Sequence, residues 1–171
     1  MDISVSHTLP SLSYNSMGWA NHKIDFIRTL LLAHGVMVCA IQEHFLLKQN
    51  LYKLACFEGF EVFSIPAHKN ENVVQGGRPS GGLALFYKQD LSKWATRVTV
   101  PNSYRVQGLK LSLPNSTLLF INAYLPNDPG TNNLDETDLI NTLQDIKYLL
   151  DQVEDDCSVI PTQTFPETLL L

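Results

Sequence analysis

Three places in the sequence join an apolar run to a polar side chain that could bind a metal ion or a phosphate. The clearest is residues 36–41, six apolar residues that are followed closely by Glu43. Asn15 ends an earlier run, and a later run leads into Tyr124 and Asn127. A carboxylate can hold a hard cation such as Mg²⁺, which needs few protein ligands, and Asn or Tyr can form hydrogen bonds with phosphate. The combination suits metal-assisted phosphoryl chemistry, although such residues also occur where strands simply end in solvent.

The segments around Glu43 predict the start of an α/β protein. Residues 36–41 are apolar and partly β-branched, which is typical of a strand that is buried on both faces of its sheet. Before them, apolar residues recur at helical spacing between Asn21, a predicted N-cap, and Gly35, a predicted C-terminal cap. With a strand at residues 3–13, this gives a β-α-β unit whose two strands are parallel. Ligands usually bind at the carboxyl ends of such strands, which is where Glu43 lies.

The rest of the chain predicts two more helices and further strands, with neither internal repeats nor a second domain. The helices cover residues 46–57 and 134–154, and the second has an apolar stripe formed by Leu139, Leu143, Ile146, Leu150 and Val153. The strands are expected at residues 61–65, 83–87, 97–100, 106–113 and 117–123. Residues 157–160 open one more buried strand, which we expect not to continue because the residues after it contain two prolines and no clear period.

The bulk composition is that of an ordinary globular protein. The chain has 171 residues, 44% hydrophobic and 17% charged, which is enough for one domain with a core. Its formal net charge of −5 gives no general attraction to nucleic acid, so bound metal or local basic residues would have to supply it. The three cysteines are far apart, the N-terminus has no secretory signal, and no apolar run is long enough to span a membrane. We therefore expect an intracellular protein with reduced cysteines, and a nuclear one if it acts on DNA.

Four segments resemble the endonuclease/exonuclease/phosphatase superfamily, and the likeness is greatest to the endonuclease domains of non-LTR (LINE-like) retrotransposons. They are Ser-Tyr-Asn-Ser-Met-Gly at residues 13–18, Ile-Gln-Glu-His-Phe-Leu at 41–46, Gly-Arg-Pro-Ser-Gly-Gly-Leu-Ala at 77–84 and Asn-Ala-Tyr-Leu-Pro-Asn at 122–127. Their order and spacing fit the superfamily from residue 11 to about residue 160. Each segment is modest by itself, and the four in sequence are fairly specific.

The resemblance implies a DNase I-like α/β sandwich, in which two β-sheets are flanked by helices, and a Mg²⁺-dependent nick in DNA. By position, Glu43 would be the metal ligand, and Asn15 would help to organise the metal and phosphate site. Tyr124 would orient the scissile phosphate, and Asn127 would contact the DNA backbone. Arg78 is a candidate for another phosphate contact, although it could equally be a solvated loop arginine.

Two catalytic motifs of the superfamily are missing. After the strand that begins near residue 157, the superfamily has Gly-Asp-x-Asn, whose Asp activates the nucleophile, and this sequence contains no Gly-Asp pair. The late Ser-Asp-His motif, which supplies the general base, is also absent, and no histidine follows His68. The earlier His34 and His44 are interpreted as a helix-end residue and a strand-exit residue. Since catalytic groups act as a unit, their loss removes nearly all activity.

We therefore expect only the first half of the usual domain, over residues 1–160, without most of the second sheet. An atypical tail follows at residues 161–171. Back-translated with degenerate codons and read two nucleotides out of frame, the tail permits Asn-Thr-Asp-Phe-Ser-Arg-Asn, while the superfamily would continue as Gly-Asp-Phe-Asn-Thr-Asp-Phe. Our hypothesis is that the tail is the catalytic motif's own DNA in a shifted reading frame, and it fails if the nucleotide sequence has other codons there.

Three functions are compatible with the sequence. The first is a domain that descends from a Mg²⁺-dependent DNA phosphodiesterase of a retroelement and keeps part of its site. The second is a non-catalytic remnant or binding module, which the missing Gly-Asp-x-Asn favours at the level of activity. The third is a phosphatase acting on a phosphorylated small molecule or lipid. The sequence similarity of the Asn15, Glu43 and Tyr124 segments to retrotransposon endonucleases argues against this third function.

Overall fold

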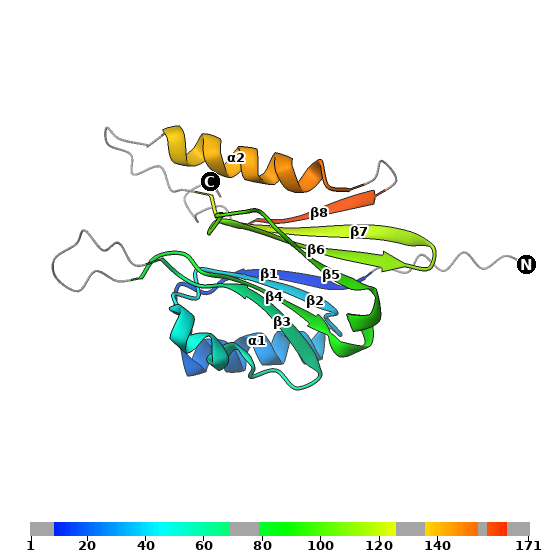
Figure 1. The fold of residues 1–171 in the computed structure, drawn as a ribbon. Coiled ribbons are helices and arrows are strands. Elements are labelled where there is room, and N and C mark those ends of the chain that lie inside the picture. The colour runs from blue at the N-terminus through cyan, green and yellow to red at the C-terminus, as the bar shows by residue number, and fades with distance from the viewer. Residues whose placement is uncertain (1–8, 69–78, 126–135, 154–156, 164–171) are drawn as a thin grey trace, which may run out of the picture.

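The computed structural model describes residues 9–68, 79–125, 136–153 and 157–163. In this part of the chain, two four-stranded sheets lie against one another, and each carries a helix on its outer face (Figure 1). The first sheet has the order β1 (Ser11–Asn15), β2 (Val38–Gln42), β4 (Leu83–Lys88), β3 (Phe60–Ile65). The second has the order β5 (Ala95–Thr99), β6 (Val106–Leu113), β7 (Ser116–Ala123), β8 (Cys157–Gln163). This is the predicted two-sheet α/β sandwich of the DNase I type.

The predicted β-α-β unit at the start of the chain is confirmed. β1 pairs with β2 in parallel, and helix α1 (Asn21–Ala33) connects them. The helix ends as predicted before Gly35, whose φ of 56° lies in the left-handed region that favours glycine. Its N-cap is Ala20 and not the predicted Asn21, because Ala20 still has an extended backbone and Asn21 is the first helical residue. No side chain caps this end.

Residues 46–57 do not form the predicted amphipathic α-helix. Lys48–Leu54 forms a 3-10 helix, η1, and the backbone leaves it at Ala55 with ψ 55°. Leu54 is the buried residue of this element, so η1 has no continuous apolar face of α-helical spacing that could pack on the sheet. Among the residues that the structure describes, no helix is long and apolar enough to cross a membrane.

The second sheet is present, contrary to the expectation that most of it is missing. β6 pairs antiparallel with β5 and with β7, and β8 pairs in parallel with β7. η2 (Gln89–Trp94), a 3-10 helix, leads from the first sheet into β5. β8 continues to Gln163, although we expected the strand to stop at residue 160. Pro161 does not interrupt it because β8 is the edge strand of this sheet in the described part of the chain, and a proline is tolerated at such an edge.

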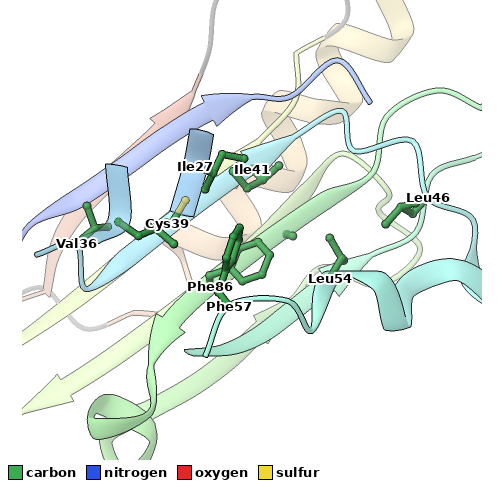
Figure 2. Close-up of a cluster of buried hydrophobic side chains, with 10 residues drawn as sticks. Ile27, Val36, Cys39, Ile41, Leu46, Leu54, Phe57 and Phe86 are labelled. Atoms are coloured by element: carbon green, nitrogen blue, oxygen red, sulfur yellow. The ribbon is translucent and has the colours of Figure 1, made fainter. Parts of the chain in front are cut away.

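Three layers of apolar side chains hold the sandwich together. The first lies between α1 and the first sheet, and Figure 2 shows among its members Ile27, Cys39, Ile41, Leu54 and Phe86. The second lies between the two sheets and includes Val38, Ala40, Leu85, Leu109 and Phe120. The third lies on the outer face of the second sheet and includes Val106, Leu119, Ile121 and Leu149. Alternate residues of β2 belong to the first and second layers, which explains why the whole strand is buried.

Helix α2 (Glu136–Leu150) covers the second sheet with a face that includes only part of the predicted stripe: Ile146, and Val153 just after the helix, pack against the core of the sheet. Leu143, a member of the predicted stripe, is 50% exposed, whereas Thr142 and Leu149 are buried. A Cβ added at Gly108 on β6 would lie 3.3 Å from Leu149 Cδ1. The absence of a side chain at Gly108 therefore allows the helix to approach the sheet at Leu149, and this contact turns Leu143 toward solvent.

Leu149→Ala should lower the free energy of unfolding by about 3 kcal/mol, because it removes a fully buried side chain and leaves a cavity between α2 and β6. Leu143→Ala, the same substitution on the same helix, is the matched control and should change this free energy by less than about 0.5 kcal/mol. Urea unfolding followed by circular dichroism measures both values. Equal effects of the two substitutions would contradict this orientation of α2.

Candidate active site

Strand ends bring three of the predicted site residues to one edge of the sandwich. β1 and β2 are parallel, with Asn15 opposite Gln42, and β7 and β8 are also parallel. All four strands end at the same edge, where the connections between β3 and β4 and between β5 and β6 also lie (Figure 1). Asn15, Glu43 and Tyr124 therefore lie at this carboxyl edge, as the β-α-β pattern predicts.

A buried hydrogen-bond network joins the two sheets just behind the carboxyl edge. Asn122 on β7 is fully buried, and its Nδ2 donates to backbone oxygens of β2 and β4, both at 3.1 Å. Its Oδ1 accepts a hydrogen bond of 2.7 Å from Gln42 Nε2. Because an unpaired buried amide is costly, these bonds fix β7 against β2. Glu43 directly follows Gln42 and Tyr124 lies two residues after Asn122, so the network brings these two side chains together.

Three further polar residues extend this network across the sandwich. Gln42 Nε2 also donates to Ser13 Oγ at 3.2 Å and to the backbone oxygen of Thr162 at 3.4 Å. Thr162 Oγ1 in turn donates to a backbone oxygen of β7 at 2.9 Å. Gln107 on β6, with its amide oxygen turned toward the donors, accepts from Asn122 Nδ2 at 3.2 Å and from backbone N–H groups of β4. The network thus ties β1, β2, β4, β6, β7 and β8 together at the edge.

Glu43 adopts a backbone conformation that is uncommon for glutamate. Its φ of 55° is left-handed, and Phe45 two residues later has a φ of 57°. The Glu43 carbonyl accepts a hydrogen bond of 2.7 Å from Gly18 N, and Phe45 N donates to Gly81 O at 3.1 Å. Two such residues in one turn store strain that the surrounding structure must hold, and strain of this kind clusters at functional sites.

Tyr124 is oriented by contacts on both of its sides. Its hydroxyl lies beside the Glu43 carboxylate. Burial raises the pKa of Tyr124 well above its ordinary value, and the neighbouring Glu43 carboxylate raises it further, while the Arg105 guanidinium lowers it. Tyr124 N donates to Arg105 O at 2.9 Å, and the guanidinium carbon lies 5.5 Å from the centre of the Tyr124 ring. The phenol is therefore protonated at neutral pH and serves as a hydrogen-bond donor.

Asn15 is half-buried and takes part in the turn that follows β1. Its Oδ1 accepts a hydrogen bond of 3.0 Å from Met17 N, which fixes the side-chain amide. The Lys23 ammonium, from the first turn of α1, donates to the carbonyl oxygens of Ser16 and Met17. With Oδ1 used in this way, Nδ2 is the atom of Asn15 that can donate to a phosphate.

His44 is a structural residue of the turn, as its interpretation as a strand-exit residue suggests. It is fully buried, its Nδ1 accepts a hydrogen bond of 2.9 Å from Leu46 N, and its Nε2 lies 3.3 Å from Leu83 O. Gly82 packs against the ring, because a Cβ added there would lie 2.5 Å from His44 Cε1. Burial lowers the pKa of His44 to about 4, so the ring is neutral at pH 7.

Among the predicted site residues that the structure describes, Glu43 is the one that offers Mg²⁺ a carboxylate. Among the described residues, no group of three or more His, Cys, Asp or Glu side chains could hold a metal ion. A single carboxylate still fits Mg²⁺, because this ion keeps several waters, but it fits a weak site. Arg78 and Asn127, the two remaining predicted site residues, lie outside the described residues.

The sequence analysis did not identify the residues that hold the site together. Asn122 and Gln107 are amides within apolar strands, and a buried amide needs partners, so this pattern was a usable signal. Gln42 lies in the segment at residues 41–46, but its residue type and position there predict no role. Arg105 carries no local signal, because its importance comes from Tyr124, a residue on another strand.

The fold is similar to solved structures of endonuclease/exonuclease/phosphatase proteins. The catalytic domain of Xenopus laevis APE2 has a TM-score of 0.59 at 15% identity, over 88% of this chain and 56% of its own. The endonuclease domain of TRAS1, a telomere-specific non-LTR retrotransposon, has a TM-score of 0.54 at 12% identity, over 86% of this chain and 57% of its own. The AP endonuclease LMAP from Leishmania major has a TM-score of 0.56 at 18% identity, over 82% of this chain and 45% of its own.

At these identities the similarity shows the fold, which is the one that the four sequence segments predict. The chain spans about half of the length of these structures. No family model and no curated protein matches the sequence.

Gly82→Ala should destabilise the chain more than Gly81→Ala. Both glycines have a left-handed φ, so both substitutions strain the backbone. Only at Gly82 would the new Cβ also meet the His44 ring, whereas a Cβ at Gly81 meets nothing within 4 Å. We expect an additional loss of about 2 kcal/mol at Gly82, because the buried ring has to move. Urea unfolding of the two variants measures the difference, and equal losses would show that His44 does not pack against Gly82.

The free energy of unfolding should decrease as the pH falls from about 6.5 to about 4. The pKa of His44 is lowered by burial from its ordinary 6.5 to about 4, so between these values the unfolded chain binds a proton that the folded chain does not. The neutral His44 ring contributes about 3 kcal/mol to the free energy of unfolding. This contribution is fully present above pH 6.5 and is lost as the pH falls to about 4. Urea unfolding between pH 4.5 and 7.5 measures it. His44→Asn keeps a neutral acceptor for Leu46 N and should flatten this dependence, and an unchanged slope would contradict the role of His44.

Proposed function

We propose that the chain carries the metal- and phosphate-binding part of a Mg²⁺-dependent DNA phosphodiesterase, in an endonuclease-like domain from a retroelement. The observation that carries this proposal is the position of the Tyr124 hydroxyl beside the Glu43 carboxylate at the carboxyl edge. The four sequence segments and the similarity to the TRAS1 endonuclease domain support the DNA substrate and the retroelement origin. We propose further that residues 1–171 bind DNA weakly and do not cleave it by themselves.

Each side chain of the edge has a separate role in this proposal. Glu43 would hold Mg²⁺, and the bound ion would offset the negative charge of a phosphate. Tyr124 is a protonated donor next to that carboxylate, so it is suited to orient a phosphate oxygen. Asn15, at the carboxyl end of β1, offers its Nδ2 as a second donor. Asn127 and Arg78 would contact the DNA backbone.

Neither Tyr124 nor His44, the titratable residues next to Glu43 in the described part of the chain, is suited to activate the attacking water. Phosphodiester hydrolysis needs a deprotonated water and also stabilisation of the charge that develops on the phosphate. Glu43, Tyr124 and Asn15 serve the second need. Tyr124 keeps its proton because its pKa is raised, and His44 is buried behind Gly82, so neither can take a proton from the water. These properties support binding without cleavage, which agrees with the sequence-based alternative of a non-catalytic module.

The chain should not nick supercoiled plasmid DNA in the presence of Mg²⁺, and Glu43→Ala should leave this background unchanged. Gel analysis of plasmid incubated with the wild type, the variant and a blank preparation measures the result. A matched experiment extends the chain after residue 160 with the Gly-Asp-x-Asn and Ser-Asp-His segments of the superfamily in frame. The extended chain should nick DNA, and Glu43→Ala should then remove nearly all of this activity because the groups act as a unit. Nicking by the unextended chain that Glu43→Ala abolishes would contradict the proposal.

A further inference from the structure

We propose that Tyr104, supported by His68 and Arg105, forms a stacking platform for an unpaired nucleobase at the rim of the Glu43 site. The chain should therefore prefer single-stranded nucleic acid to duplex DNA. This inference rests on the proposed function for the identification of the ligand as nucleic acid. It adds that the ligand is single-stranded, and it identifies the surface that binds an unpaired base.

Tyr104 and His68 come from different sheets and stack on one another. Tyr104 lies in the connection between β5 and β6, and His68 follows β3, where its backbone forms two hydrogen bonds of 2.9 Å with Ser80. The two ring centres are 5.6 Å apart and the ring planes are inclined by 28°. Both side chains are exposed, and Tyr104 retains 39% of its accessible surface. An exposed aromatic pair thus bridges two loops at the carboxyl edge.

Arg105 connects this aromatic pair to the candidate active site. Its guanidinium carbon lies 4.9 Å from the centre of the Tyr104 ring and 5.5 Å from the centre of the Tyr124 ring. Its carbonyl oxygen accepts the hydrogen bond from Tyr124 N. Because both tyrosine rings contact one guanidinium, a base on Tyr104 would belong to a nucleotide adjacent to a phosphate held at Tyr124.

The charges around Arg105 favour a base over a phosphate at Tyr104. The guanidinium forms a 2.9 Å ion pair with Asp138 of α2, which offsets its charge. Asp138 and Asp145 also line a polar cavity of about 250 Å³ beside Tyr104, together with Asn102, Ser103 and Asn141. Two carboxylates repel a phosphate backbone, whereas hydroxyl and amide groups can form hydrogen bonds with the edges of a base. The backbone would therefore follow the Glu43 side, and the base would turn toward Tyr104.

An unpaired base is the group that such a platform can bind. Tyrosine, histidine and arginine planes stack on bases that are splayed out of a helix, and this stacking tolerates any sequence because every base has a π-face. In a duplex both faces of each base are already covered by neighbouring bases. Stacking on Tyr104 is therefore available to a single strand, a flap or a frayed end, and not to the interior of a duplex.

Fluorescence anisotropy with a labelled single-stranded 12-mer in EDTA tests the proposal. Tyr104→Ala should weaken binding by about tenfold, as expected for the loss of one stacked base. Tyr104→Phe should bind like the wild type because it keeps the ring. Tyr148→Ala is the matched control, since Tyr148 is 41% exposed near the other end of α2, and it should change nothing. On a 12-mer of abasic nucleotides, the wild type and Tyr104→Ala should bind equally.

Two outcomes would overturn the proposal. One is an unchanged affinity of Tyr104→Ala for the single strand. The other is an equal loss on the normal and abasic strands, which would mean that Tyr104 acts through the backbone or the fold. Urea unfolding of Tyr104→Ala checks its stability, and Tyr104→Leu, which keeps apolar bulk without a π-face, should also lose about tenfold.

The metal site is tested separately because the anisotropy measurement contains no divalent cation. Adding Mg²⁺ should strengthen binding of the abasic strand through Glu43, and Glu43→Gln should remove this gain. Absence of the gain would count against the proposed function and leave the stacking platform intact. Equal binding of the normal and abasic strands by the wild type would overturn the stacking platform and leave the proposed function intact.

Discussion

The arrangement of the two sheets depends on the buried amide of Asn122. Apolar contacts between the sheets supply most of the stabilisation, but they have no direction, so they would permit the sheets to slide. The fully buried amide of Asn122 has to satisfy its donors and its acceptor within the protein, and its partners are backbone oxygens of β2 and β4 and the side chain of Gln42. A shift of one residue would leave these groups unpaired at a cost of about 1–3 kcal/mol each. The amide therefore fixes the relative position of the sheets, and through it the distance between Glu43 and Tyr124.

The turn that carries Glu43 shows how the structure holds a strained conformation. Left-handed φ values at Glu43 and Phe45 are unfavourable for residues with a side chain, and local propensity alone would not produce them. The backbone oxygens of Gly81 and Gly82 accept hydrogen bonds from Phe45 and His44, and the His44 ring fills the space beside Gly82. Gly82 is therefore needed for close packing against this turn, in addition to any contact that its segment makes with a ligand.

The sequence predicted the features that depend on local patterns. The β-α-β start and the buried strand before Glu43 follow from unbroken periodicity and from Gly35 at the helix end. The face of α2 could not be predicted in the same way, because it depends on the lack of a side chain at Gly108, on a distant strand. β8 was underestimated because proline lowers strand propensity, and only the sheet order reveals that Pro161 lies at an edge.

The residues of the candidate site also fall into those that local sequence patterns predict and those that depend on the fold. Asn15, Glu43 and Tyr124 were accessible to sequence reasoning because each follows an apolar run, and Glu43 and Tyr124 are in contact in the structure. Arg105 was not accessible, because its effect on Tyr124 arises only when β6 and β7 pair. Asn122 and Gln107 could have been found by asking which polar residues within apolar strands would lack a partner.

In the proposed function, binding and bond cleavage would be separable because they would depend on different strand ends. β1, β2 and β7 supply Asn15, Glu43 and Tyr124, and the Asn122 network holds these strands together without any group that ionises. β8 contributes Thr162 to the network, and the threonine hydroxyl is used up in a hydrogen bond to β7. A side chain that follows β8 could therefore change without disturbing the packing behind the edge. Under the proposed function, such a chain would lose or gain water activation at the end of β8 while it kept the proposed surface for phosphate and base.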